Sequence, residues 1–113
     1  MKVIEKNVGP KIYYSANGTK LNLNDELILD LAKYERDFDV NLDICENEFN
    51  MLVIGLGRRY VAQIHIPARQ YVEVEIENGD GPEGEGESIR LEPVPFSMEN
   101  VTLTLWAIEG GIQ

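Results

Sequence analysis

Eight residues near the middle of the chain decide its fold, and they read Asp37-Phe38-Asp39-Val40-Asn41-Leu42-Asp43-Ile44. Polar and apolar side chains alternate without exception through this stretch. Because successive side chains of a β-strand point to opposite faces, the alternation places four apolar groups on one face and four polar groups on the other. The stretch therefore predicts a strand with one buried face.

The same alternation recurs in residues 60–66, 71–77, 88–91 and 101–106. Residues 51–56 form a continuous apolar run, which predicts a central strand covered on both faces. Residues 11–15 predict a short strand that ends at the turn signal Asn17-Gly18. Together these segments predict a mainly β fold, a single antiparallel β sandwich or partly closed barrel of about seven strands.

Residues 25–36 fit two structures. Leu27, Leu31 and Tyr34 fall on one helical face and Asn24 can serve as the N-cap, whereas Leu27, Leu29 and Leu31 also alternate as in a strand. Most residues of the segment are good helix formers. We therefore expect one short helix near residues 25–36 and leave the strand open as the alternative.

The segments 60–66, 71–77 and 88–92 predict a meander of three neighbouring strands. If their apolar faces match, His65 lies opposite Glu73 and Arg90 lies opposite Glu75. The connection between the last two strands, residues 78–87, holds four glycines, a proline and four acidic residues. We expect it to be a flexible, acidic, glycine-rich hairpin loop.

The length of 113 residues predicts a single β-rich domain spanning residues 1–113. Cys45 is the only cysteine, which excludes a disulfide or a cysteine-based metal site formed by one chain alone. The N-terminus lacks the apolar core of a secretory signal, and no window is apolar enough for a membrane helix. We therefore expect a cytoplasmic protein without contact to a membrane.

The net charge of −10 is unevenly distributed. Residues 1–70 carry nine Lys and Arg against ten Asp and Glu, whereas residues 71–113 carry one Arg against ten acids. Such an asymmetry indicates a polarised surface or an electrostatic partner. The acids concentrate on the predicted second hairpin, at Glu73, Glu75, Glu77, Asp80, Glu83, Glu85 and Glu87.

Motifs for catalysis and for cofactor binding are weak. His65 is the only histidine and lies on the polar face of its predicted strand, without a nucleophile motif. Gly55-Leu56-Gly57 lacks the third glycine of a dinucleotide fingerprint, and the evenly spaced Asp residues of the opening strand lie too far apart to hold one ion. We predict no catalytic residue, no cofactor and no metal site, while Ca²⁺ binding by residues 78–87 stays open.

The acidity disfavours direct binding to nucleic acid, because attraction to phosphate supplies most of that affinity. Arg58, Arg59 and Arg69 predict a small basic patch beside the acidic hairpin. Trp106 lies on the strand face opposite Leu103 and Leu105, where it is either exposed for an interface or buried in a second core layer. We therefore predict a non-enzymatic binding or assembly module, such as a homo-oligomeric structural component. It would contact a protein partner, or itself, through the acidic hairpin, the arginines and the aromatic strand face. The alternative is an acidic inhibitor or nucleic-acid mimic that binds a basic protein surface.

Overall fold

The computed structural model describes residues 1–76 and 88–108. Within them the chain forms ten strands and two short 3-10 turns, which confirms the mainly β fold class. The elements are β1 (Lys2–Glu5), β2 (Tyr14–Asn17), β3 (Lys20–Leu23), β4 (Leu27–Asp30), η1 (Leu31–Tyr34), β5 (Val40–Glu46), β6 (Leu52–Ile54), β7 (Arg59–Ile66), β8 (Tyr71–Ile76), β9 (Ser88–Pro93), η2 (Met98–Asn100) and β10 (Thr102–Leu105).

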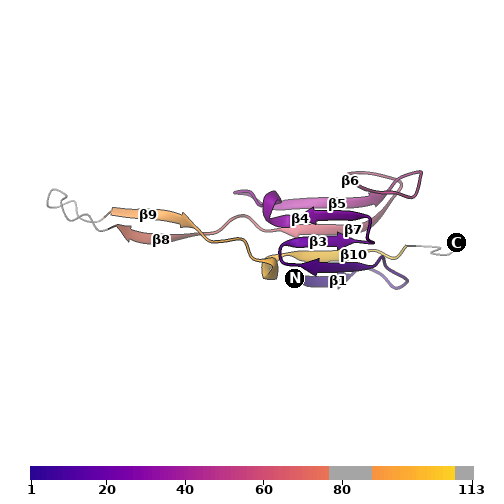
Figure 1. Cartoon of the computed structure of the whole chain (residues 1–113), viewed down its shortest axis with the longest axis horizontal. Helices are drawn as coiled ribbons and strands as arrows, with labels where there is room; N and C mark the ends of the chain where they lie inside the picture. The colour runs from indigo at the N-terminus through magenta and orange to yellow at the C-terminus, as the bar shows by residue number, and fades with distance from the viewer. Residues whose placement is uncertain (77–87, 109–113) are drawn as a thin grey trace.

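Two sheets face each other in a sandwich, and a two-stranded hairpin projects from it (Figure 1). The larger sheet has the order β1-β10-β7-β5-β6, and the smaller one is the meander β2-β3-β4. All neighbours pair antiparallel except β1 and β10, which run parallel. The sheets do not close into a barrel, so of the two predicted architectures the sandwich is the observed one.

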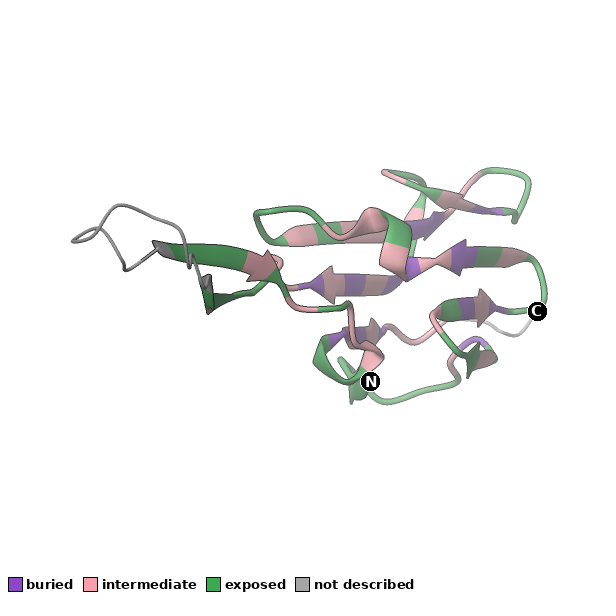
Figure 2. Ribbon diagram, turned by 60° about the vertical axis from the view of Figure 1, so that its left-hand side comes forward, coloured by how far each residue is buried: buried purple, intermediate pink, exposed green. Residues whose placement is uncertain are grey.

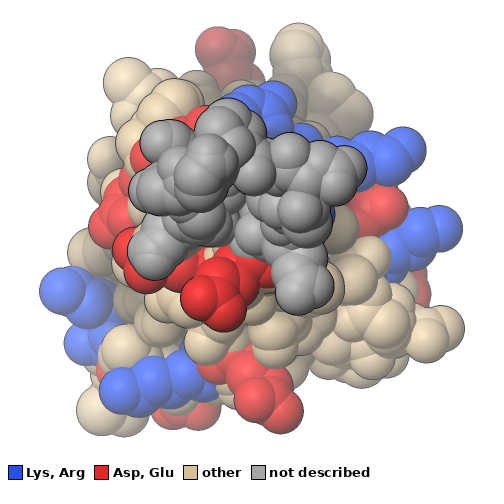
Figure 3. Space-filling view, turned by 90° about the vertical axis from the view of Figure 1, so that its left-hand side faces the viewer, with Lys and Arg blue, Asp and Glu red and all other residues tan. Residues whose placement is uncertain are grey.

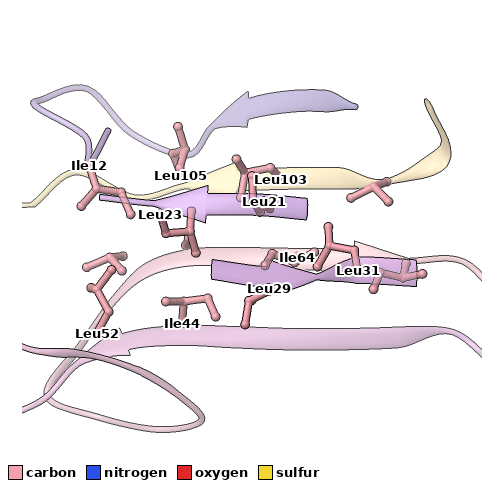
Figure 4. Close-up of a cluster of buried hydrophobic side chains, with 14 residues drawn as sticks. Ile12, Leu21, Leu23, Leu29, Leu31, Ile44, Leu52, Ile64, Leu103 and Leu105 are labelled. Atoms are coloured by element: carbon pink, nitrogen blue, oxygen red, sulfur yellow. The ribbon is translucent and has the colours of Figure 1, made fainter. Parts of the chain in front are cut away.

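The hydrophobic core lies between the two sheets (Figure 4). The small sheet and the turn after it contribute fully buried leucines, and the large sheet meets them with aliphatic side chains of β5, β7 and β10. The largest fully buried side chains are Leu21, Leu23, Leu31, Ile44, Ile64, Ile66, Leu103, Val61, Val101 and Cys45. These groups hold the two sheets together, since burial of apolar surface is the main force stabilising such a fold.

From Val40 onward, the alternation of residues 37–44 correctly predicted the central part of this core. The placement of Phe38 on the buried face was wrong, because Phe38 precedes the strand and is 63% exposed. Strand β5 begins at Val40, and its partners across β7 place Leu42 opposite Ile64 and Ile44 opposite Ala62. On the outer face of the same strands, Asp43 lies opposite Gln63. Asp37 and Asp39 precede the strand and have other contacts, described below.

Residues 25–36 contain much less helix than expected. Residues 27–30 are strand β4, and only the single 3-10 turn at 31–34 is helical. Asn24 is no N-cap, because Asn24 and Asp25 have φ angles of 57° and 55°, and together they form the tight turn between β3 and β4. Asparagine and aspartate tolerate this left-handed conformation, and such turns join antiparallel strands. The leucine alternation in 27–31 was thus the correct signal.

The predicted meander is wrong at its first step. Strand β7 pairs with β5 and β10, while β8 pairs with β9. His65 therefore lies opposite Asn41 and Thr102 instead of Glu73. The β8–β9 pairing exists, but shifted by one residue, so that Glu75 lies opposite Ile89 and not Arg90.

Residues 51–56 also differ from the expectation. Strand β6 lies at the edge of the large sheet, and Ile54 is exposed. The predicted loop 78–87 lies outside the described residues.

The packing predicts a sharp contrast between two leucines. Leu103→Ala empties a fully buried site and should lower the free energy of unfolding by about 2–5 kcal/mol. Leu91→Ala, at a side chain that is 60% exposed, should change it by less than about 0.5 kcal/mol. Urea unfolding followed by circular dichroism at low protein concentration measures both values. Equal losses would contradict the assignment of the core to the sandwich.

Candidate interaction surfaces

The hairpin of β8 and β9, here called the arm, projects from the sandwich, and most of its ribbon has the colour of exposed residues (Figure 2). Exposed apolar residues lie on both of its faces. Tyr71, Val72, Ile89 and Leu91 are 42%, 50%, 57% and 60% exposed. A two-stranded hairpin on its own is at best marginally stable in water. Among the residues that the structure describes, nothing pairs with the outer edges of the arm, and its apolar surface is exposed.

The two faces of the arm differ in charge. Residues directly opposite each other share a face, so Glu73 and Leu91 lie together, as do Glu75 and Ile89. The other face carries Arg90 and Glu92, whose side chains form an ion pair with an N–O distance of 2.6 Å. Acidic side chains gather beside the arm when the molecule is viewed from its end (Figure 3). We call the side with Glu73, Glu75, Ile89 and Leu91 the carboxylate face of the arm.

Charged groups fix the arm where it leaves the sandwich. Asp37 accepts hydrogen bonds from the Tyr71 hydroxyl at 2.6 Å and from the Arg69 guanidinium at 3.1 Å, and Arg69 also contacts Glu35. The backbone N–H of Arg69 donates to the carbonyl oxygen of Arg36. These contacts tie the start of β8 to the segment that precedes β5.

Asp39 makes a second connection at this neck. Its carboxylate accepts a hydrogen bond from the backbone N–H of Ala68 at 2.9 Å and contacts the His65 ring at 3.1 Å. The Ala68 hydrogen bond, followed by that of His65, lowers the pKa of Asp39 below its ordinary value of 3.8. The sequence missed this role, since Asp39 was assigned to a strand face.

A groove of about 540 Å³ lies at the other end of the sandwich from the arm. It is formed by the ends of β1 and β10 and the start of β7, with the lining residues Asn7, Val8, Gly9, Pro10, Arg59, Tyr60, Trp106, Ala107 and Ile108. The rings of Tyr60 and Trp106 stack with a centroid distance of 5.5 Å. The groove therefore has a largely apolar wall, built by the start of β7 and by the segments that follow β1 and β10.

Backbone contacts hold the walls of the groove in place. Asn7 accepts a hydrogen bond from the Ala107 N–H at 2.8 Å, and the Ile108 N–H donates to the Pro10 carbonyl at 2.8 Å. Gly9 has a φ of 138°, and a Cβ there would lie 2.9 Å from the Ala107 Cβ. Only glycine fits this position without distortion.

Two basic side chains, Lys6 and Arg59, border the groove. The Lys6 ammonium lies 5.5 Å from the centroid of the Trp106 ring, within the range of a cation–π contact. Arg59 lines the groove and binds Glu46 through two nitrogens at 2.9 and 3.0 Å, while the neighbouring Arg58 is exposed. The three arginines expected together are therefore divided, because Arg58 and Arg59 lie at the groove end while Arg69 lies at the base of the arm.

The outer face of the large sheet carries polar groups that bind one another. Gln63 donates to Asp43 at 3.1 Å and accepts a hydrogen bond from the Trp106 indole at 3.1 Å. His65 contacts Asp39, as described above, and Cys45 is buried. Among residues 1–76 and 88–108, no three His, Cys, Asp or Glu side chains gather in a way that could hold a metal ion.

The structure separates the predicted interaction residues into two groups. Glu73 and Glu75 lie on the arm, whereas Arg58, Arg59 and Trp106 lie at the opposite end of the sandwich. The remaining predicted acids, Glu77, Asp80, Glu83, Glu85 and Glu87, lie outside the described residues. The sequence did not predict that Ile89 and Leu91 are exposed or that Tyr60 and Val8 line a groove. Both properties depend on which segments meet in the folded chain, and the local pattern around these residues does not indicate that.

No protein-family model, curated protein or solved structure matches the chain. Within the described part of the chain, none of the helical segments has the length and apolar character that a membrane span requires.

The neck contacts predict that Tyr71→Phe loosens the arm. Loss of the hydrogen bond to Asp37 should raise local opening at the base of β8 roughly threefold, as expected for about 0.7 kcal/mol. Arg90 is the only Lys or Arg after residue 70, so the rate of tryptic cleavage there reports on the arm alone. Tyr13→Phe, at an exposed tyrosine outside the arm, is the matched control. Equal cleavage of both variants would refute the anchoring role.

The Asp39 contact predicts a pH dependence at the neck. Because its folded pKa lies below the ordinary 3.8, the contact is fully present above that value and is lost as the pH falls through the folded pKa. The Ala68 amide signal in two-dimensional NMR should titrate with a midpoint below 3.8. Asp39→Asn should abolish this titration. A midpoint at or above the ordinary value would contradict the assignment.

Proposed function

We propose that the protein is a non-enzymatic assembly module, a homo-oligomeric structural component that contacts its partners through the arm and the aromatic face at Tyr60 and Trp106. The observation that carries this proposal is the arm itself. Within residues 1–76 and 88–108, no further strand pairs with its outer edges and its apolar side chains are exposed. Open edges and exposed apolar groups are the features through which β proteins bind further chains.

The energetics favour a partner for the arm. Covering Ile89 and Leu91, each more than half exposed, would contribute about 1 kcal/mol or more per side chain. Two molecules lose translational and rotational freedom when they associate, and this loss opposes binding. A single arm contact is therefore expected to give moderate affinity. Moderate contacts suit an assembly in which each copy is held by more than one neighbour.

The acidic-mimic alternative rests on Glu73 and Glu75, which are exposed on one strand at a spacing of about 7 Å. Regularly spaced carboxylates can occupy a basic protein surface. The same face also presents Ile89 and Leu91, which a purely electrostatic mimic does not need. A self-assembly interface would use both these carboxylates and these apolar side chains. We therefore prefer self-assembly to the acidic-mimic function.

A cytoplasmic location belongs to the proposal. It is supported by Cys45, a buried free thiol, which is ordinary in a reducing compartment.

Light-scattering mass measured over a range of concentrations tests the assembly function. The wild-type protein should exceed the monomer mass at high concentration, and Ile89→Ser/Leu91→Ser should shift that transition to at least about tenfold higher concentration, since two apolar contacts are lost. Ile28→Ser, at a 62% exposed isoleucine of β4, is the matched control and should behave like wild type. A monomer at all concentrations, in both low and high salt, would remove self-assembly in favour of the mimic.

A further inference from the structure

The arm and the groove lie at opposite ends of the molecule (Figure 1). The Cα atoms extend 73 Å along the longest axis and 21 Å along each of the others. A chain therefore cannot place its own arm in its own groove. Any copy that fills the groove with an arm must be a neighbour.

The two surfaces match in chemistry. The carboxylate face of the arm carries Glu73 and Glu75 on β8, and directly opposite them Leu91 and Ile89 on β9. The groove offers an apolar wall of Pro10, Tyr60 and Trp106, with cationic side chains around it. Its volume is in the range of pockets that enclose apolar groups and use a few polar contacts for specificity.

The choice of arm face follows from charge. On the opposite face, the ion pair of Arg90 and Glu92 neutralises itself within the arm. Glu73 and Glu75 share their face with apolar side chains, so a partner with cations beside an apolar wall complements this face. Lys6 and Arg58 supply such cations at the groove end.

We propose that the groove receives the carboxylate face of the arm from a second copy of the chain, which joins the copies head to tail. This inference rests on the proposed assembly function and specifies its interface. A contact between two different surfaces is heterologous, so it extends into an open row unless the rotation between copies closes a ring.

Val8→Glu tests the groove at a residue that can change without harm to the fold. Val8 lines the groove and is 98% exposed, so a glutamate there adds a negative charge that repels Glu73 and Glu75. We expect the dissociation constant for self-association to rise at least about tenfold. Ile28→Glu introduces the same charge on β4, outside the residues that line the groove, and should leave association within about twofold of wild type.

Mixing two defective variants tests the head-to-tail arrangement directly. Ile89→Ser/Leu91→Ser has a damaged arm and an intact groove, while Val8→Glu has an intact arm and a damaged groove. Each alone should remain monomeric, and an equimolar mixture should form a heterodimer that does not grow further, measured by sedimentation velocity. A mixture that stays monomeric would overturn the inference, because the intact arm of one variant would then not bind the intact groove of the other.

The remaining outcomes separate the two proposals. If wild type does not associate at all, the assembly function fails. If wild type associates but Val8→Glu associates equally well, the groove is not the receptor and the assembly function stands. A truncation after Ile108 should associate like wild type. Loss of association in this truncation, with normal association of the arm variant, would identify the C-terminal residues as the occupant and refute the arm.

Discussion

A β-strand has two edges, and both edges of β7 are taken in this fold. Strand β5 occupies one side and β10 the other, with Ile64 placed between Leu42 and Leu103 in the core. The chain that leaves β7 at Ile66 therefore finds no free edge on the strand it has just formed. It continues through the neck, where Asp37 and Asp39 hold it, and β8 is left with β9 as its partner. The projecting arm is thus a consequence of the saturated central strand.

The arm does not pack against the core, so its strand register is not fixed by a buried apolar face. When one face of a sheet is buried, the apolar pattern fixes the register, and without a buried face this constraint disappears. Pairing Val74 with Leu91 would have produced one continuous apolar face, which invites indiscriminate edge and face contacts. The observed register instead puts Glu73 beside Leu91 and Glu75 beside Ile89. Carboxylates among the apolar groups oppose association with plain hydrophobic surfaces and permit it with a surface that offers cations.

Local periodicity predicted which residues face the core but not which strands meet. The alternation of residues 37–44 correctly assigned Val40, Leu42 and Ile44 to the inner face, because that assignment depends only on the geometry of one strand. The neighbours of β7 lie far away in sequence, so parity alone could not exclude β8 as a partner. In the same way, Arg58, Trp106 and Glu73 could be proposed as surface residues, but their division between two ends follows from the long-range pairing. Asn24-Asp25 was the local signal for a turn, and helix propensity outweighed it.

The opposite placement of arm and groove follows from the topology. Strands β7 and β10 are antiparallel neighbours, so the residues before β7 and those after β10 must lie at one end of the sheet. Tyr60 and Trp106 meet there for this reason. Everything inserted between the two strands leaves from the other end, and the arm is that insertion. The charge asymmetry along the sequence thereby becomes a spatial one, because the length of the sandwich separates Glu73 and Glu75 of the arm from the cations Lys6 and Arg58 at the groove end. The arm and the groove are complementary surfaces at opposite ends of one chain, and they cannot contact each other within that chain. This is the geometric condition for head-to-tail assembly.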